Sequence, residues 1–374
     1  MKFSDVLDIR NGRNQRQVEN ANGKYPIYGS GGVMGRATDF ICDAGTVVIG
    51  RKGSINNPIF VDEPFWNVDT AFGLVAHRDV LLPKYLFYFC ANFDFERLNT
   101  TVTIPSLTKA NLLQIEINVP DMDEQRHVVS VLDKICRLTD LQQQELHNLD
   151  QLVKSRFIEL FGEPQRNPHG YKHIKLSDIA TYYNGLTYKP ENIAAEGTIV
   201  LRSSNIQNSQ LDFADTVRVD CAIKERLMVQ NNDILMCSRN GSAKLVGKVA
   251  MIKDIQEPMS FGAFMMIIRS HYFGYLMTYF QMDAFRQQIK TGATTTINQI
   301  TGRMLDDVTI PLPPMALVDQ FAAFVEQTDK SKYYSAIIYR KSGEPYCQSE
   351  KRSICIYKIF SRCSIWFPIT YRIG

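Results

Sequence analysis

Two short polar strips carry residue types that could recognise a nucleic acid. Arg51-Lys52-Gly53-Ser54 and Arg239-Asn240-Gly241-Ser242 each combine a cation, a glycine and a hydroxyl. Arg can donate two hydrogen bonds to guanine O6 and N7, Asn can pair with adenine, and Lys or Ser can bind phosphate. The alternative is a solvated hairpin turn, because Lys-Gly and Asn-Gly are ordinary turn sequences. Recurrence of the strip favours a binding role.

Other polar segments could add contacts of the same kind. They are a loop at 202–205, a glycine-rich segment at 28–35, and hydroxyl- and amide-rich stretches at 103–106 and 294–299. Their side chains suit phosphates or base edges, but they equally suit helix caps and turns. The candidate nucleic-acid-binding residues are Arg51, Lys52, Gly53, Ser54, Arg239, Asn240, Gly241, Ser242, Arg202, Ser203, Asn205, Ser30, Arg36, Thr103, Ser106, Thr295 and Asn298.

No catalytic signature accompanies these residues. A phosphate-binding loop needs a hydroxyl after Gly-Lys, and Val249 follows Gly247-Lys248. Pro311-Leu-Pro-Pro314 lacks the Asn or Asp and the aromatic residue of an adenine methyltransferase motif. The eight cysteines form no Cys-x-x-Cys pair, and the six histidines offer no zinc spacing, so we interpret the cysteines as buried apolar residues. We expect no active site, metal or cofactor in this chain.

The chain contains an internal repeat whose offset grows from 173 to 195 residues. Growing offsets are expected when loops are inserted into one copy, so ordered matches favour a duplication over chance. The matches, in order, are 2–6 with 175–179, 11–12 with 184–185, 51–54 with 239–242, 71–72 with 263–264, 85–86 with 275–276, 103–120 with 296–313, and Gln125 with Gln320.

Both copies predict the same order of elements. A short β-branched or apolar run bounded by turn residues predicts a strand, an aromatic-rich segment predicts a helix, and an alternating segment predicts a closing strand. The strands are expected at 45–50 and 233–237, the helices at 83–89 and 272–280, and the closing strands at 115–119 and 308–312.

A long helix is predicted over 123–161. Asp121, Asp123 and Glu124 suit a helix N-terminus, apolar residues then recur every three or four positions, and Gly162 with Pro164 ends the pattern. A single apolar stripe of this length requires a partner helix. A second helix begins at about residue 316, but its pattern ends near Lys332, although the repeat calls for nearly forty residues.

The composition changes after this point. Residues 331–374 contain six tyrosines, three cysteines and no leucine. One interpretation is a short basic domain. The other, which we favour as a hypothesis, is that the native reading frame is lost near residue 332. A gene sequence in which no single-base shift restores a leucine-rich continuation resembling 134–161 would contradict it.

Overall composition indicates a folded protein, long enough for two ordinary domains or one large one. The chain has 374 residues, 45% of them apolar, and a net charge of +3, which excludes a disordered chain. Lys2, Asp5, Asp8 and Arg10 interrupt any signal-peptide core, and no apolar stretch approaches the roughly 18 residues of a membrane span. We therefore expect a cytoplasmic protein that does not enter a membrane.

Residues 1 to about 330 resemble the DNA-specificity (S) subunits of type I restriction-modification systems. The resemblance is carried by Lys-x-Ser-Asp at the head of each copy and by the order of copy, long helix, copy and second helix. It also rests on the segments 49–54, 65–70, 120–125 and 155–162.

This resemblance implies an α+β fold with two similar mixed α/β target-recognition domains separated by long α-helices that form an antiparallel spacer. The second helix is expected to be truncated. The implied boundaries are target-recognition domain 1 at 1–120, spacer helix 1 at 121–162, target-recognition domain 2 at 163–313, the start of spacer helix 2 at 314–332, and an atypical tail at 333–374.

The resemblance also implies a function. Each domain would read one half of a bipartite site in double-stranded DNA, and the helices would fix the gap and bind modification (M) subunits. The M subunits would carry S-adenosylmethionine and methylate adenine N6, while a restriction (R) subunit would use ATP and Mg; this chain would be non-catalytic and hold no cofactor. The implied subunit-binding residues are Val128, Val131, Ile135, Leu138, Leu146, Leu149, Val153, Phe157, Leu317, Phe321 and Phe324.

Two alternatives stay open. A decayed or phase-varied S subunit would bind DNA without supporting modification, since a truncated second helix predicts weak assembly with the M subunits. A generic two-domain scaffold would show no salt-dependent DNA binding, because only phosphate contacts make affinity fall steeply with salt.

Overall fold

The computed structural model describes residues 1–98, 106–289 and 298–341, with backbone alone for 333–341. The described chain divides into unit 1, from Met1 to Glu145, and unit 2, from Leu146 to Lys332. Unit 1 contains α1 (Phe3–Val6), β1 (Leu7–Asn11), β2 (Tyr25–Gly29), β3 (Gly32–Ala37), β4 (Thr46–Gly50), β5 (Ile59–Val61), β6 (Trp66–Asn67), β7 (Ala71–Ala76), α2 (Pro83–Asn92), η1 (Phe95–Leu98), α3 (Lys109–Leu113) and the start of α4 (Met122–Phe161).

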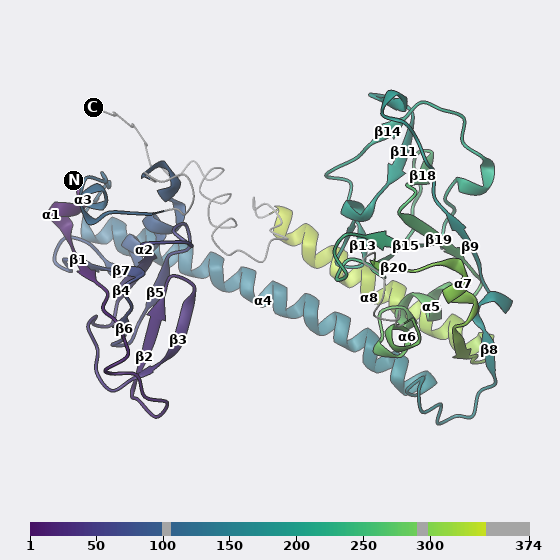
Figure 1. Cartoon of the computed structure of the whole chain (residues 1–374), viewed down its shortest axis with the longest axis horizontal. Helices are drawn as coiled ribbons and strands as arrows, with labels where there is room; N and C mark the ends of the chain where they lie inside the picture. Colours follow the sequence, from purple (N-terminus) through teal and green to yellow (C-terminus); the bar gives the residue numbers. More distant parts are fainter. Residues whose placement is uncertain (99–105, 290–297, 342–374) are drawn as a thin grey trace. The chain divides into compact units, whose positions relative to one another are not determined.

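The main sheet of unit 1 has the order β1-β7-β4-β5, with all neighbours antiparallel (Figure 1). Its central strand β4 is buried at every residue. Val47 and Ile49 pack in a cluster with Phe3 and Leu86, whereas Val48 packs in a second cluster with other side chains. The strand is therefore an uninterrupted apolar run because both faces of the sheet are covered.

Unit 2 repeats this sheet in the order β9-β19-β15-β17 and adds a second sheet of order β10-β14-β11-β18. Its elements are the end of α4, β8 (His173–Lys175), η2 (Leu176–Asp178), β9 (Thr181–Asn184), η3 (Pro190–Asn192), β10 (Ile193–Ala194), β11 (Thr198–Leu201), η4 (Ser203–Asn205), β12 (Ile206–Gln207), β13 (Gln210–Leu211), β14 (Arg218–Val219), η5 (Glu225–Leu227), β15 (Ile234–Cys237), β16 (Arg239–Asn240), β17 (Val249–Met251), β18 (Met259–Phe261), β19 (Met265–Arg269), α5 (Phe273–Tyr279), α6 (Asp283–Gln288), β20 (Asn298–Gln299), α7 (Gly302–Asp306), β21 (Thr309–Pro311) and α8 (Met315–Lys341).

The duplication is confirmed by corresponding local structures in the two units. Thr108 caps α3 and Thr301 caps α7, and each hydroxyl accepts a hydrogen bond from the backbone amide three residues later. Lys2 bridges to Glu116 in unit 1, and Lys175 pairs with Thr309 in unit 2. The predicted strands and helices of both copies lie at the predicted positions. The exception is 115–119, which forms only an isolated β-bridge instead of a strand.

The start of α4 is fixed by two side chains. Asp121 caps the helix, because its Oδ1 accepts hydrogen bonds from the amides of Asp123 and Glu124 at 3.0 and 2.9 Å. Gln125 is 0% exposed; its Oε1 accepts the Leu82 amide at 2.8 Å and its Nε2 donates to the carbonyls of Val80 and Pro120. One buried amide thus ties the helix to the segment that leads into α2.

Gly162 ends α4 as predicted. Its φ is +74°, its amide donates to the Ile158 carbonyl at 2.8 Å, and a Cβ at this position would lie 2.3 Å from Pro168 Cγ. Both the left-handed backbone and the lack of space require glycine here.

The end of α4 and the start of α8 pack antiparallel within unit 2. Lys332 Nζ contacts Asp150 Oδ1 at 2.6 Å, Arg156 lies over the Phe324 ring, and the rings of Phe157 and Phe321 are 5.6 Å apart. This pairing confirms the predicted antiparallel helices. The backbone of α8 continues to Lys341, nine residues past the expected end of the pattern at Lys332, and stops before Ser342-Gly343; it is still shorter than the 40 residues of α4.

Cys42, Cys90 and Cys237 are buried, whereas Cys136 and Cys221 are half-buried, so the apolar role expected for the cysteines holds fully for three of them. Burial raises the pKa of the Cys42 thiol to about 12. The other three cysteines lie outside the described residues. Within the described part of the chain, no helix is both long enough and apolar enough to span a membrane.

We predict that Gln125→Ala lowers the free energy of unfolding by about 2–4 kcal/mol, because the buried Leu82 amide loses its acceptor and two carbonyls lose their donor. Urea denaturation of the full chain measures the change. Gln320, which the sequence matched to Gln125, is exposed, and an exposed side chain without partners of this kind contributes little. Gln320→Ala is therefore the control and should change stability by less than about 0.5 kcal/mol. Equal effects of the two substitutions would contradict the assigned role.

Candidate nucleic-acid interface

The strip of unit 1 follows β4 and is held by backbone hydrogen bonds. The amides of Arg51 and Lys52 both donate to the Thr70 carbonyl, at 2.8 and 3.4 Å, and the Leu107 amide donates to the Arg51 carbonyl at 2.9 Å. Lys52 also forms a bridge with Ser106. The side chains of 51–54 are exposed, so the strip offers cations and a hydroxyl to solvent from a fixed backbone.

The strip of unit 2 follows β15 and has the same backbone pattern. The amides of Ser238 and Arg239 donate to the Phe264 carbonyl at 3.0 and 3.1 Å, and the Ile300 amide donates to the Ser238 carbonyl at 2.8 Å. Arg239 pairs with Gln299 where β16 meets β20. Two copies of one backbone arrangement therefore present polar side chains at the end of equivalent strands.

The pairing corrects the register of the two strips. The last residue of each central strand pairs with the first residue of its neighbour, Gly50 with Ala71 and Cys237 with Met265. Lys52 therefore corresponds to Arg239, and Arg51 to Ser238, one residue away from the motif match. For the same reason Ala71-Phe72 corresponds to Met265-Met266, not to Ala263-Phe264. The motif match compares residue types, whereas hydrogen bonding between strands sets the structural register.

Ser30 lies beside the strip of unit 1. An added Cβ on Gly50 would be 2.3 Å from the Ser54 carbonyl oxygen and 3.1 Å from Ser30 Cβ. The glycine-rich segment that contains Ser30 is the hairpin between β2 and β3, with open space around Gly31 and Gly32, so it is a turn. The hairpin comes close to the strip at its Ser30 end.

The polar residues of unit 2 form one cluster. Asn240 Nδ2 donates to Ser203 Oγ at 3.3 Å, its Oδ1 accepts the Ser242 amide at 3.0 Å, and Asn298 Nδ2 lies 3.5 Å from the Gly241 carbonyl. The structure thus brings together five of the predicted residues from segments far apart in the sequence.

Three predicted residues have local structural partners. Asn205 is 1% exposed: its Nδ2 donates to the carbonyls of Asp212 and Asp215 at 2.8 Å, and its Oδ1 accepts the Arg202 amide. The prediction that Asn205 contacts nucleic acid is wrong, because its side chain is buried and its amide is hydrogen-bonded to three backbone groups of the loop. Arg202 pairs with Asp215 at 2.7 Å, and Arg36 donates to the carbonyls of residues 23 and 24.

Thr103 and Thr295 lie outside the described residues. Thr70 and Phe264 belong to the backbone arrangement of the strips but were not predicted, whereas Gln299 lies in the predicted stretch 294–299. The only signal for Thr70 and Phe264 is the strand register, which a single sequence does not reveal.

The residues predicted to bind partner subunits divide by burial. Phe157 and Phe321 are 0% exposed in the core of unit 2, so that part of the prediction is corrected: no partner can reach them. Val153 and Leu317 pack against the same core and Val128 against that of unit 1. Leu138 is 61% exposed, the largest exposure among these residues. Val131, Ile135, Leu146, Leu149 and Phe324 are half-buried.

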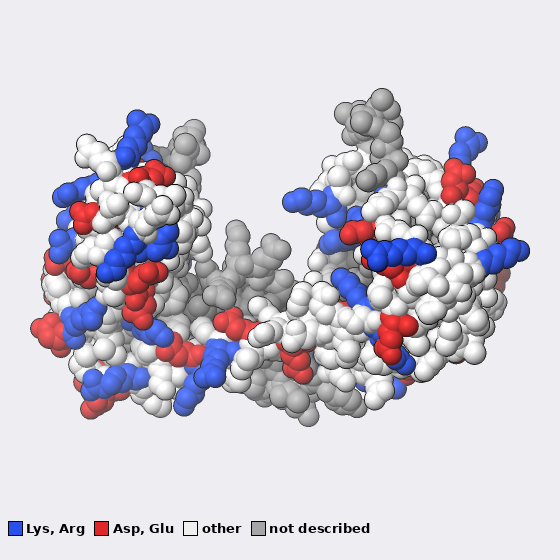
Figure 2. Space-filling model, turned by 90° about the horizontal axis from the view of Figure 1, so that it is seen from below, with Lys and Arg blue, Asp and Glu red and all other residues white. Residues whose placement is uncertain are grey.

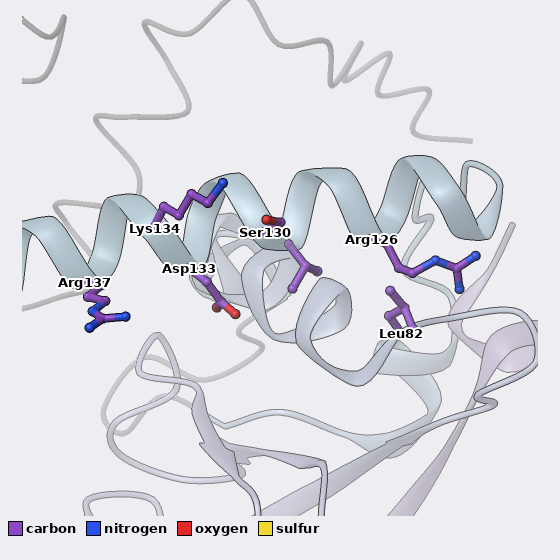
Figure 3. A pocket seen from close by; sticks show the side chains of 7 residues that line it. Leu82, Arg126, Ser130, Asp133, Lys134 and Arg137 are labelled. Carbon is purple, nitrogen blue, oxygen red and sulfur yellow. The ribbon is translucent and has the colours of Figure 1, made fainter.

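A hollow of about 400 Å³ lies where α4 passes α2. Figure 3 shows Arg126, Ser130, Lys134 and Arg137 along α4, with Leu82 on the segment before α2. Asp133 in this hollow accepts hydrogen bonds from Lys84 Nζ at 2.7 Å and the Tyr88 hydroxyl at 2.6 Å. Burial, with this hydrogen bond, raises the pKa of Tyr88.

Charge on the surface in view is mixed. Figure 2 shows Lys and Arg interspersed with Asp and Glu rather than gathered into one basic patch. Among the described residues, no group of three or more His, Cys, Asp and Glu side chains is arranged to hold a metal ion.

Comparisons with known proteins give one consistent family. Residues 1–151 and 168–333 match the family model for the type I restriction modification DNA specificity domain. The chain is 28% identical over 178 residues to the type I restriction enzyme EcoKI specificity subunit of Escherichia coli (strain K12) and, to the same degree, to the StySPI specificity subunit of Salmonella potsdam. Each match covers 44% of this chain and 38% of the relative.

The fold is also similar to a solved structure. The crystal structure of the type I restriction-modification system S subunit from M. genitalium aligns with a TM-score of 0.62 at 16% identity, covering 96% of this chain and 95% of that one. At this identity the likeness concerns the fold, and it agrees with two similar α/β units and long helices.

We predict that Asn205→Ala lowers the free energy of unfolding by about 2–3 kcal/mol, since the loop carbonyls and the Arg202 amide lose their partner in a buried place. Urea denaturation is the measurement. Ser204→Ala, on the exposed neighbour, is the matched control and should be nearly neutral. Unchanged stability of Asn205→Ala would return this residue to the list of candidate contacts.

Proposed function

The chain belongs to the type I restriction-modification DNA specificity family, and we propose that it reads a DNA site composed of two separate half-sites. Unit 1 reads one half-site and unit 2 reads the other. The observation that carries the proposal is the repeated backbone arrangement, which presents Lys52 in one unit and Arg239 in the other beside further polar side chains.

The side chains of the strips suit contacts of two kinds. Lys52 and Ser54 are exposed and suit phosphate oxygens, which position a protein on the duplex without reading sequence. Arg239 suits the O6 and N7 acceptors of guanine in the major groove, and such pairs carry sequence information. A mixed surface charge agrees with a protein in which few cations face the DNA and other subunits share the phosphate contacts.

The chemistry belongs to other subunits in this proposal. The chain recognises DNA, modification subunits bind S-adenosylmethionine and methylate adenine N6, and a restriction subunit uses ATP and Mg. The target adenine is flipped out of the duplex by the modification subunit, because a base inside the stack is inaccessible to an enzyme. The two E. coli and Salmonella relatives, which support this division of labour, are specificity subunits by name.

We propose that the exposed part of α4 contacts these subunits. Leu138 and Leu141 are 61% and 51% exposed and lie three residues apart on the helix, so together they offer a small apolar surface to a partner. The hollow beside Arg126, Lys134 and Arg137 adds cations to the same helix and suits an acidic partner surface.

The reading-frame hypothesis for residues after about 332 also stays a proposal. The family match stops at residue 333, close to Lys332, where the apolar pattern of the second helix ends, and residues 331–374 contain no leucine. In this case the chain binds DNA but assembles weakly with modification subunits, and a corrected frame restores stable assembly. Stable, stoichiometric co-purification of the chain as printed would contradict this part.

A map of N6-methyladenine in the host genome, with and without the gene, tests the main proposal. Loss of methylation at a split motif, two short half-sites around a fixed gap, is the expected result. An unchanged map, together with DNA binding that does not respond to salt, would favour a scaffold without DNA specificity.

We predict that Lys52→Ala weakens DNA binding by a similar factor for all sequences and reduces the slope of log affinity against log salt by about 1, as expected for one lost phosphate contact. Salt titrations of duplex binding by the full chain measure both quantities. Arg166→Ala removes a cation that pairs with Glu163 and should leave the slope unchanged. A Lys52→Ala slope equal to that of the wild type would show that Lys52 does not touch the DNA.

A further inference from the structure

Three pairs of positions are equivalent in the two units because backbone hydrogen bonds define them. In each unit, one backbone carbonyl accepts hydrogen bonds from the amides of two successive residues. The carbonyl of the first of these two residues accepts a hydrogen bond from an amide of a third segment. We call this arrangement the frame. Its equivalent positions are Lys52 with Arg239, Thr70 with Phe264, and Ser106 with Gln299.

The side chains at these positions differ in chemistry, although the frame is the same. Unit 1 places an ammonium and two hydroxyls on it, whereas unit 2 places a guanidinium, a phenyl ring and an amide. Arg and Gln can each make two hydrogen bonds to one base, to guanine and adenine respectively, whereas Ser and Thr offer one hydroxyl each, and Lys can contact either guanine or a phosphate. The two units therefore present different recognition chemistry from one scaffold.

Phe264 is the most unusual of these residues. Its side chain is 58% exposed, but its backbone is held by three donors, the amides of Ser238 and Arg239 and the Ser238 hydroxyl at 3.0 Å. The Arg239 guanidinium lies 5.3 Å from the ring centroid. A single exposed apolar residue needs no explanation by itself. Here, however, three hydrogen bonds hold the Phe264 backbone, and the ring lies beside a cation that directly precedes Asn240 in the chain.

We propose that the frame positions of unit 2, Arg239, Phe264 and Gln299, determine which bases this unit reads, and that the Phe264 ring contacts the methyl group of a thymine in its half-site. This inference rests on the proposed function. A phenyl ring suits the thymine methyl because that group is the one apolar feature in the major-groove pattern of base edges. The adjacent Arg239 then reads a neighbouring guanine, with its guanidinium oriented by the ring.

The test is a selection from a pool of random duplexes by the full chain, purified with whichever subunits accompany it, comparing wild type with Phe264→Thr. The variant carries the residue that unit 1 has at the equivalent position. We expect the wild type to enrich a motif with two half-sites. Phe264→Thr should keep one half-site unchanged and lose about tenfold in enrichment at one or two adjacent positions of the other.

The retained half-site is an internal control for folding and assembly. Ile193→Thr is a second control: Ile193 is 53% exposed in the same unit, and its strand β10 lies at the opposite edge of the sheet from β18. This variant should enrich the wild-type motif at both half-sites.

Replacing thymine with uracil in the recovered half-site removes only the methyl group. Binding by the wild type should fall, and binding by Phe264→Thr should fall less, because a threonine methyl makes a smaller apolar contact with the thymine methyl than a phenyl ring does. An equal effect of uracil on both proteins, or a recovered half-site without thymine, overturns the methyl contact.

The remaining outcomes are also decisive. An unchanged motif with Phe264→Thr overturns the inference while leaving the proposed function intact. Loss of both half-sites together shows a structural role and also overturns it. If the wild type enriches no motif at all, the proposed function fails and this inference fails with it.

Discussion

Five buried aromatic rings from three helices hold unit 2 together. Phe157 and Phe161 at the end of α4, Tyr275 and Tyr279 on α5, and Phe321 on α8 form a chain of neighbouring rings, with centroids 4.9–6.1 Å apart. Such ring pairs contribute about 0.5–1.5 kcal/mol each beyond the apolar area that they bury. The end of the long helix is therefore part of the core of unit 2, and Phe321 reaches the cluster from α8, which packs antiparallel to it. At the other end of α4, the buried amide of Gln125 performs a corresponding role in unit 1 with hydrogen bonds instead of rings.

The elements of the fold could be predicted from local sequence because their signals are local. Alternation at 308–312, the acidic cap at Asp121 and the stop at Gly162 each depend on a few neighbouring residues. The register between the two copies could not be predicted from local sequence, because it depends on which amide donates to which carbonyl across a sheet. Arg51 and Arg239 are the same residue type with similar neighbours, yet strand pairing makes Lys52 the structural equivalent of Arg239.

The candidate site shows the same limit. A polar residue in a loop suggests a contact with a ligand, but Asn205 turns its amide inward, where it is hydrogen-bonded to two carbonyls and an amide. A helical apolar stripe suggests a contact with a partner, but the stripe of α4 includes both the buried Phe157 and the exposed Leu138. Residue type predicts what a side chain can bind; only the packing around it decides whether the partner is the protein itself.

The frame is built from main-chain atoms, and this has an evolutionary consequence. Amides of 51, 52 and 107 and their counterparts in unit 2 make its bonds, so the scaffold does not require a particular side chain at the positions that it displays. Substitutions at the displayed positions change the stability of the fold little, whereas a change of side-chain volume in the core is costly. One duplicated gene segment can then diversify each copy independently, and new combinations of half-sites arise by drift at a few surface codons without a new fold.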